Sequence, residues 1–424
     1  MPLECLESCR SLSAVIRLDE RAARLAGGEQ HATVRDLRAV LGVQAIRAYL
    51  YGLGSVVIGA SLADGGLSAA EVGWVFTSIL AGMALSSTLV GLIGERVGRR
   101  RLYVGLLLTV GVAGSVFALT RSVPLLVLAG LTGCLSTDPN ESGPITSLEQ
   151  AMIGQAPAPL RLGVFGRYNA VAYVAGAVGA LTGALPGLLE TDARRWLFLY
   201  PVLAVVAAWV ARSLSDGVEA GDADPDASRV PLRRSRRTVG RLASLFAIDS
   251  FAGGFIVQSF VVFWFGRTFG ASVEVMGVVF FVSGLLQGAS SILASRVAQR
   301  FGMLNTMVFT HLPSNALLVL IPMSPHLAGA IALWLARVTL SQMDVPARQA
   351  FIVALVDPDE RVAAAAFTNT ARYVSRPIGP AVAGALMQTA TGAPFFIAGG
   401  VKIVYDLLIY AAFRRVELPD TSSR

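Results

Sequence analysis

Long apolar runs alternate with short polar stretches along the chain from residue 41 onward. Each run has about 20 residues or more, the length that an α-helix needs to cross the hydrocarbon core of a bilayer. Because a helix satisfies its own backbone polar groups, as lipid demands, the pattern predicts an all-α membrane protein with twelve transmembrane helices. The runs lie at 41–62, 70–94, 102–120, 123–147, 165–188, 196–214, 242–265, 274–299, 304–323, 327–350, 363–386 and 393–413.

A polar stretch at 215–241 divides these runs into two groups of six. We therefore predict an N-terminal six-helix bundle at 41–214, a cytoplasmic linker at 215–241 and a C-terminal six-helix bundle at 242–413. The tails at 1–40 and 414–424 are also expected in the cytoplasm, because arginines gather on the side that holds the tails and the linker. The N-terminal tail has no apolar stretch typical of a cleavable signal peptide.

Composition supports a lipid environment and argues against several other classes of protein. Of the 424 residues, 54% are hydrophobic and 15% are charged, whereas soluble chains carry about 25% charged residues. The net charge of +7 would suggest nucleic-acid binding in a soluble protein, but here the bases lie beside apolar runs and indicate membrane orientation. The three cysteines are too few for a disulfide framework. We find no metal-ligand spacing, P-loop, Rossmann glycine pattern or GxSxG element, so we predict no metal, no cofactor and no enzymatic activity.

The two halves of the chain resemble each other in three places that occur in the same order. The separation is 204 residues for the first two matches and 200 residues for the third. This order predicts a six-plus-six duplication, and parallel repeats are typical of transporters whose halves rock about a central site. The matches join 67–76 to 271–280, 94–101 to 298–305, and 167–179 to 367–379.

The segment GLIGERVGRR at 91–100 is the most specific motif in the chain. It resembles the GxLaDRxGRR signature of the major facilitator superfamily, with Glu95 in place of the usual aspartate; the matching residues are Gly91, Arg96, Gly98, Arg99 and Arg100. The resemblance extends over roughly residues 40–415. It implies the fold of that superfamily, secondary active transport by alternating access, and a cytoplasmic gate at this loop. An anchor that only sets membrane orientation is the alternative role for the loop.

Two departures from the family pattern qualify this resemblance. The second-half copy of the motif has Gln299 at the acidic position and Met303 at a basic one, which predicts a weaker gate there. The antiporter signature GxxxGPxxGG is not matched in the run 165–188, which has no Gly-Pro pair.

Polar side chains inside the apolar runs are the main functional signal, because an ionisable group at bilayer depth costs about 2.5–3.5 kcal/mol on insertion scales. In the fourth run, Asp138 and Glu141 are spaced i,i+3, and Pro144 is expected to break the helix nearby. We interpret these acids as a buried proton or cation site, with a solvated loop after an early helix end as the alternative. Glu149 is expected at the cytoplasmic surface beside the arginines of the gate.

We predict that Asp249 and Asp344 share the coupling role with the two acids of the fourth run. Substrate binding is assigned to polar side chains within the runs, namely Arg47, Asn140, Gln258, His311, Asn315, Arg337, Asn369, Arg372, Tyr373 and Arg376. The last four form one stripe on the eleventh run and are expected to face a central cavity. For Arg372 and Arg376 we favour contact with an anion, with pairing to Asp344 as the alternative.

Two further polar groups receive structural interpretations. Lys402 and Asp406 are spaced i,i+4 in the last run and are interpreted as an internally neutralised pair. For His311, packing within the core is favoured over proton transfer.

Two transport mechanisms fit these residues. In the first, Asp138 and Glu141 titrate and proton binding alternates with substrate binding, which gives efflux by proton antiport. In the second, the arginine stripe binds an organic or inorganic anion, and a proton neutralises a carboxylate during symport. We favour efflux, because the acids concentrate in the inner half, where an outward-moving solute first binds. We expect a monomer in a bacterial-type cytoplasmic (plasma) membrane, with a small molecule or ion as substrate and the proton as coupling ion; a non-transporting receptor or scaffold is the alternative of another class.

Overall fold

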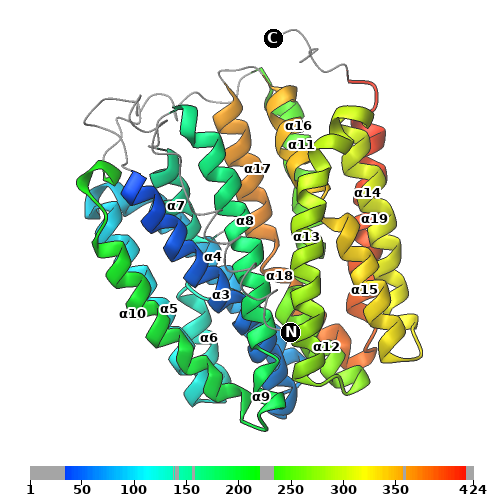
Figure 1. Ribbon diagram of the computed structural model, residues 1–424. Helices are drawn as coiled ribbons and strands as arrows, with labels where there is room; N and C mark the ends of the chain where they lie inside the picture. Colours follow the sequence, from blue (N-terminus) through cyan, green and yellow to red (C-terminus); the bar gives the residue numbers. More distant parts are fainter. Residues whose placement is uncertain are drawn as a thin grey trace, which may run out of the picture. The chain divides into compact units, whose positions relative to one another are not determined.

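A computed structural model of the chain describes residues 34–136, 138, 143–154, 158–219, 234–356 and 360–416. All regular structure within these ranges is helical, as the sequence predicts (Figure 1). In the described residues, nine helical stretches are long and apolar enough to cross a membrane. The runs predicted at 123–147, 242–265, 327–350 and 363–386 contain pairs of shorter helices.

The helices of the first half follow the predicted runs in order. They are α3 (Val34–Asp64), α4 (Ala69–Val97), α5 (Arg99–Leu119), α6 (Val123–Leu131), α7 (Pro144–Gly154), α8 (Ala158–Thr182), α9 (Leu185–Leu188) and α10 (Leu199–Arg212), with short 3₁₀ turns η1 (Ala193–Phe198) and η2 (Asp216–Val218).

The second half repeats this arrangement with more interruptions. Its helices are α11 (Arg236–Gly254), α12 (Gln258–Phe269), α13 (Val273–Phe301), α14 (Met303–Leu320), α15 (Leu327–Ser341), α16 (Asp344–Leu355), α17 (Arg361–Ser375), α18 (Ile378–Thr389) and α19 (Ala393–Phe413), with η3 (Ile321–Met323) after α14.

Prolines stand at the start of the second helix in three of the interrupted runs, whereas α12 begins at Gln258 without one. Pro144 is the first residue of α7, as expected from its missing N–H, and Pro346 lies in the first turn of α16. Pro377 is the N-cap of α18. A proline fits the first turn of a helix but disrupts its interior, so each of these runs restarts at its proline. Because of these breaks, helix ends and polar side chains lie within the apolar runs.

The chain divides into two compact units. Unit 1 comprises Met1–Gly65, Ser78–Ala223 and Ser272–Phe281; unit 2 comprises Gly66–Thr77, Asp224–Ala271 and Val282–Arg424. Each unit therefore takes a short segment from the other half of the chain.

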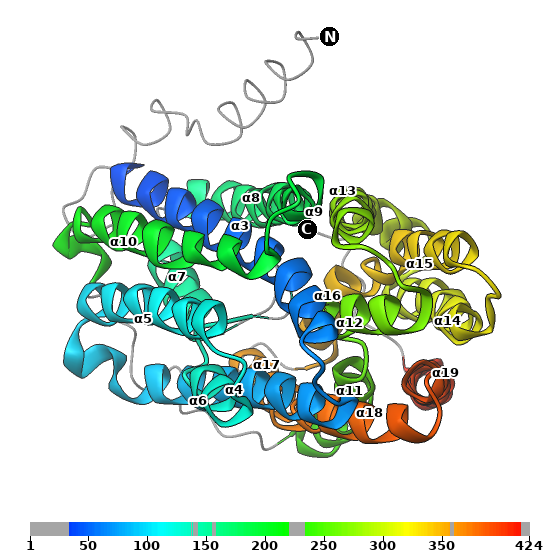
Figure 2. The ribbon, with the colours of Figure 1, turned by 90° about the horizontal axis from the view of Figure 1, so that it is seen from below.

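Small residues allow close helix packing in unit 1, where α3 packs on α8 (Figure 2). A Cβ atom added at Gly52 would overlap the carbonyl oxygen of Gly176, and one added at Gly179 would overlap the carbonyl oxygen of Tyr49. Glycines at such a contact let two backbones approach as closely as they do in membrane helix pairs.

In unit 2, α14 packs against α15, α16 and α19, while α11 packs against α17 and α19. These contacts bring α11, α14, α16 and α19 together around buried polar side chains.

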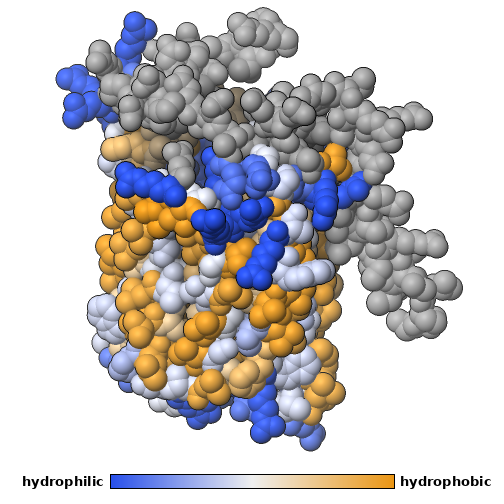
Figure 3. Space-filling view, turned by 90° about the vertical axis from the view of Figure 1, so that its left-hand side faces the viewer, coloured by the Kyte–Doolittle hydropathy of each residue, from blue (hydrophilic) through white to orange (hydrophobic). Residues whose placement is uncertain are grey.

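The outward faces of the helices are apolar, as a lipid-facing surface requires. In the face that Figure 3 draws, apolar side chains are concentrated across the middle, among neutral ones, while hydrophilic side chains gather above and below them. Along α5 and α10, large apolar side chains stay exposed, including Val112, Leu119, Val202 and Trp209. Exposed apolar side chains in this number are unfavourable in water and support a membrane location.

Candidate transport site

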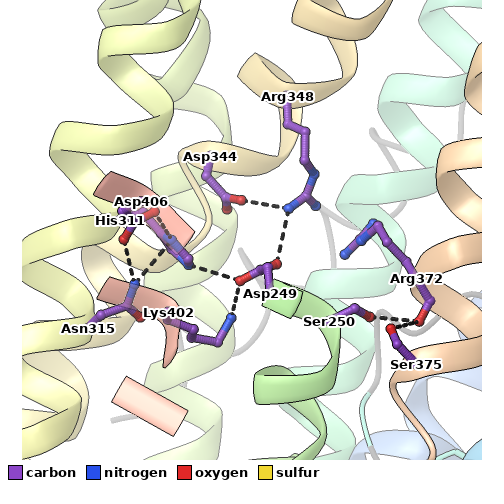
Figure 4. A network of polar contacts seen from close by, with 10 residues as sticks. All are labelled: Asp249, Ser250, His311, Asn315, Asp344, Arg348, Arg372, Ser375, Lys402 and Asp406. Carbon is purple, nitrogen blue, oxygen red and sulfur yellow. Dashed lines mark hydrogen bonds and ion pairs between the residues drawn. The ribbon is translucent and has the colours of Figure 1, made fainter. Parts of the chain in front are cut away.

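Unit 2 contains a buried network of ionic side chains drawn from four helices (Figure 4). Its centre is Asp249 on α11. The Nζ atom of Lys402 on α19 lies 2.5 Å from Oδ1 of Asp249. The guanidinium of Arg348 on α16 lies 3.7 Å from the other carboxylate oxygen. Asp249 thus ties the first helix of this half to the last one and to the restarted helix α16.

A second carboxylate holds the histidine of the network. The Nδ1 atom of His311 lies 2.8 Å from Oδ1 of Asp406, and the side-chain amide of Asn315 donates to the other oxygen at 2.9 Å. The opposite ring nitrogen, Nε2, lies 3.9 Å from Oδ1 of Asp249. His311 therefore stands between two carboxylates, one on α11 and one on α19.

The third carboxylate is Asp344, the first residue of α16. It accepts a hydrogen bond of 2.8 Å from Arg348, one helical turn later. These side chains have little access to solvent: Asp249 is 4% exposed and Asp406 is 1% exposed. Buried charges persist in a low-dielectric interior when they are paired and hydrogen-bonded, as these are.

The contacts correct one interpretation of the sequence. Lys402 and Asp406 do not neutralise each other, although they are one turn apart on α19. Lys402 bonds to Asp249, while Asp406 bonds to His311 and Asn315. The intrahelical pairing fails because both side chains find partners on neighbouring helices.

Arg372 lies beside this network on α17. Its backbone carbonyl accepts hydrogen bonds from the hydroxyls of Ser250, at 2.9 Å, and Ser375, at 3.1 Å. Its Nε atom is buried and has no hydrogen-bond partner among the residues that the structure describes. The alternative pairing of Arg372 with Asp344 is not what the contacts show, because Arg348 occupies that carboxylate.

The rest of the predicted stripe is less buried. Asn369 is exposed and Tyr373 is 38% exposed, while Arg376 is partly buried at the end of α17. Gln258 begins α12 and is partly buried, and Arg337 on α15 stacks over the ring of Trp334 at 5.1 Å.

Unit 1 has a separate buried network around Glu149 on α7. Its carboxylate accepts hydrogen bonds from Arg47 at 2.7 Å, from Tyr168 at 2.6 Å and from Tyr103 at 2.8 Å. Arg47 also donates to Gln44 on its own helix. The expected surface position of Glu149 is wrong, since the residue is fully buried. The amphipathic pattern of α7 was too short to show which side faces inward.

The acids predicted in the fourth run are only partly described. Asp138 lies in a bend outside any helix, so the predicted single helix over 123–147 does not hold there. The hydroxyl of Ser136 donates to the backbone carbonyl of Asp138 and accepts from its N–H. Asn140 and Glu141 lie outside the described residues.

The motif predicted as a gate forms a capped turn in unit 1. Gly98 has a φ of 91° and is the residue that joins α4 to α5. The carboxylate of Glu219 accepts from the backbone N–H of Arg99 at 2.6 Å and of Arg100 at 3.2 Å. An anionic side chain at a helix N-terminus satisfies orphan donors and interacts favourably with the helix dipole. Gly91 and Arg96 are exposed, and nothing is described of the Glu95 side chain.

The guanidinium groups of the motif reach the end of α10. Arg100 donates to the carbonyl of Leu214 at 2.8 Å and lies 3.3 Å from Asp216. Gly302, at the matching position of the second half, has a φ of 86° and precedes α14. Both halves thus use the same glycine turn at positions 204 residues apart, as the duplication requires.

Comparison with known proteins decides the family. The sequence model described as Major Facilitator Superfamily matches residues 40–341 and 242–424. The chain belongs to the Major Facilitator Superfamily. The uncharacterized membrane protein YJR124C of Saccharomyces cerevisiae is 24% identical over 425 residues, which cover 90% of this chain and 95% of that protein.

Solved structures share the superfamily fold. The nucleoside transporter NupG has a TM-score of 0.69 at 13% identity, covering 89% of this chain and 99% of that chain. The D-xylose-proton symporter has a TM-score of 0.69 at 16% identity, covering 92% of this chain and 99% of that chain. A bacterial homolog of the human lysosomal transporter Spinster has a TM-score of 0.65 at 14% identity, covering 89% and 94%. The chain is therefore a multi-pass membrane protein with the fold of Major Facilitator Superfamily transporters.

Proposed function

We propose that this protein is a proton-coupled secondary transporter of a small solute, with the Asp249 network of unit 2 as its coupling site. Membership of the superfamily supports secondary transport. The observation that supports proton coupling is the position of His311 between the carboxylates of Asp406 and Asp249. Histidine is a common residue for proton transfer in proteins, because each ring nitrogen can donate or accept a proton.

The hydrogen bonds around His311 fit two arrangements of one proton. The amide of Asn315 lies 3.1 Å from Nδ1 of His311, and the same nitrogen faces Asp406. Either Nδ1 carries a proton and donates to Asp406, or Asp406 is protonated and donates to Nδ1. A proton that enters this contact alters the charge next to Asp249. It thereby changes the strength of the contacts that Asp249 makes with Lys402 and Arg348.

A structural neighbour that is a D-xylose-proton symporter gives further support to proton coupling. At 16% identity this likeness shows the fold alone, so its support for proton coupling comes from the shared architecture.

The direction of transport has two candidates. Efflux by antiport rests on Asp138 and Glu141. The backbone of Asp138 forms a turn with Ser136, and Glu141 lies outside the described residues. Symport of an anion with a proton is favoured by a specific observation, the buried guanidinium nitrogen of Arg372 that lacks a hydrogen-bond partner among the described residues.

The experiment is flux into proteoliposomes that contain the full-length protein, with and without an imposed pH gradient. The solute panel contains D-xylose, uridine, benzoate and inorganic phosphate. We expect the gradient to drive at least one solute, and its sign relative to the solute gradient separates antiport from symport. If Asp138→Asn leaves the gradient response unchanged while His311→Gln removes it, the coupling site lies in unit 2. Solute flux that is equal with and without the gradient would overturn proton coupling.

A further inference from the structure

Arg372 lies beside the ionic network but takes part in none of its ion pairs. Figure 4 shows its guanidinium pointing toward Arg348 and Asp249, while the hydrogen bonds drawn at this residue reach its backbone carbonyl. The acids that face it, Asp249 and Asp344, already bind Lys402 and Arg348. The Nε atom of Arg372 is buried without a hydrogen-bond partner among the described residues. A buried donor left unpaired is costly, so a function for this arrangement is expected.

The charge balance of the network depends on His311. The network contains three carboxylates and three permanent cations. Asp249 and Asp344 contact cations directly, whereas Asp406 bonds to His311 and Asn315. Those cations are Arg348, Lys402 and Arg372. With a neutral His311 the set is balanced, and with a protonated His311 it carries one excess positive charge. Arg376, one turn beyond Arg372, adds to the positive potential at that site.

We propose that Arg372 binds an oxyanion group of the solute, a carboxylate or a phosphate, and that this anion enters together with the proton on His311. The inference rests on the proposed proton-coupled transport and adds the substrate class. A guanidinium presents parallel N–H donors that match both kinds of oxyanion. The groups facing His311 are Asp406, Asn315 and Tyr405 from α19 and α14, and Asp249 from α11.

The coupling follows from electrostatics. A protonated His311 places a positive charge beside Asp249 and offsets part of the negative charge of that carboxylate. Less of the Asp249 charge is then left to offset the positive charge of Arg372. A bound anion then offsets the excess positive charge of the network. Protonation of His311 therefore raises the affinity for the anion. By thermodynamic linkage, the bound anion raises the proton affinity of His311 by the same factor. A monovalent anion and one proton move together without net charge, so this transport is insensitive to membrane potential.

The first test measures ligand binding by thermal stabilisation of the full-length protein in detergent. The probes are benzoate and inorganic phosphate, with benzamide as the neutral counterpart of benzoate. We expect at least one anion to raise the melting temperature, more at acidic pH than at alkaline pH, while benzamide does not. Stabilisation by benzoate alone identifies a carboxylate site, and stabilisation by phosphate alone identifies a phosphate site. Failure of both anions to stabilise the wild type overturns the inference.

The second test uses variants at Arg372. Arg372→Gln should weaken binding of the stabilising anion by about 10- to 100-fold, the range of a charge-assisted hydrogen bond. Arg372→Lys keeps the charge and should retain part of the affinity. The exposed residue Arg414, directly after α19, provides the matched control, Arg414→Gln, which should bind like the wild type. Equal anion binding by Arg372→Gln and the wild type contradicts the proposal.

The stability of the ligand-free variant separates this role from a structural one. Arg372→Gln removes a partly buried cation that takes part in none of the ion pairs of the network, so the melting temperature without anion should change little. A clear fall would assign Arg372 to the structure and overturn the proposal. The proposed function fails separately: Arg372-dependent anion binding without any flux driven by a pH gradient would retain the site and reject proton-coupled transport.

Discussion

The Nζ atom of Lys402 lies 2.5 Å from Oδ1 of Asp249, although 153 positions of the sequence separate the two residues. This contact joins α19 to α11 and leaves Asp406, one turn along α19, to bind His311. The last helix of the chain is therefore part of the polar network, and its two charged residues serve different partners.

Loss of Lys402 should destabilise unit 2. Lys402→Met leaves the buried Asp249 with Arg348 at 3.7 Å and His311 at 3.9 Å. Removing one partner of a buried ion pair costs about 3–5 kcal/mol. The measurement is the free energy of unfolding of the full-length protein in mixed micelles.

The double variant Asp249→Asn, Lys402→Met should recover a large part of this loss, because it no longer buries an unpaired charge. The control is Arg414→Gln, an exposed residue directly after α19, which should change stability by about 0.5 kcal/mol or less. Equal stability of Lys402→Met and the wild type would show that the contact does not form.

The network of unit 1 gives a graded series. Glu149→Gln leaves Arg47 buried without a carboxylate and should cost about 3–5 kcal/mol. Tyr103→Phe removes only one hydrogen bond to that carboxylate and should cost about 1.5–3 kcal/mol. Unfolding measurements check the order, with Tyr49→Phe on α3 as a partly buried control. A larger loss for Tyr103→Phe than for Glu149→Gln is inconsistent with an ionic centre at Glu149.

The turn at Gly98 should tolerate no side chain without strain. With a φ of 91°, Gly98→Ala costs about 1–3 kcal/mol, and the new Cβ would lie 3.3 Å from Glu219. Gly302 has a similar φ of 86°, and no atom lies within 4 Å of the position of a new Cβ. Gly302→Ala therefore measures the backbone strain alone. Gly91→Ala lies in a helix with no atom within 4 Å and should be neutral or stabilising. Thermal unfolding of the three variants should rank them in this order, and a Gly98→Ala variant as stable as Gly91→Ala contradicts the capped turn.

The close approach of α3 and α8 predicts a sharp contrast between two glycines of one helix. Gly52→Ala places a Cβ on the carbonyl oxygen of Gly176, so the helices must separate. Gly42→Ala, on the same helix, meets no atom within 4 Å. We expect Gly52→Ala to lose at least about 1 kcal/mol of unfolding free energy, as overpacked cores do. Gly42→Ala should lose none, and similar values for both would argue against the packing of these helices.

The helical fold could be predicted from the sequence because it depends on local signals. Apolar runs of sufficient length identify membrane helices. The breaks after Leu131, Ser341 and Ser375 were harder to predict, since apolar composition continues across them.

The polar contacts depend on helix packing, which sequence spacing does not determine. Asp249, Asp344, His311 and Asn315 were selected from the sequence and lie in one network. Arg348 was missed, although its i,i+4 spacing from Asp344 was a usable signal. Glu149 was placed at the surface, because its partners Tyr103 and Tyr168 come from two other helices.

Proton movement during solute transport tests the central claim most directly. Proteoliposomes with an enclosed pH-sensitive dye receive the solute that the flux panel identifies, and solute uptake and internal pH are recorded together. The proteins compared are the wild type, His311→Gln, Asp249→Asn and the control Arg414→Gln. The account predicts that solute moves protons in the wild type and in Arg414→Gln. In His311→Gln and Asp249→Asn, it predicts that solute exchange at equal pH persists and proton movement is lost. Proton movement at the wild-type rate in both network variants would contradict it.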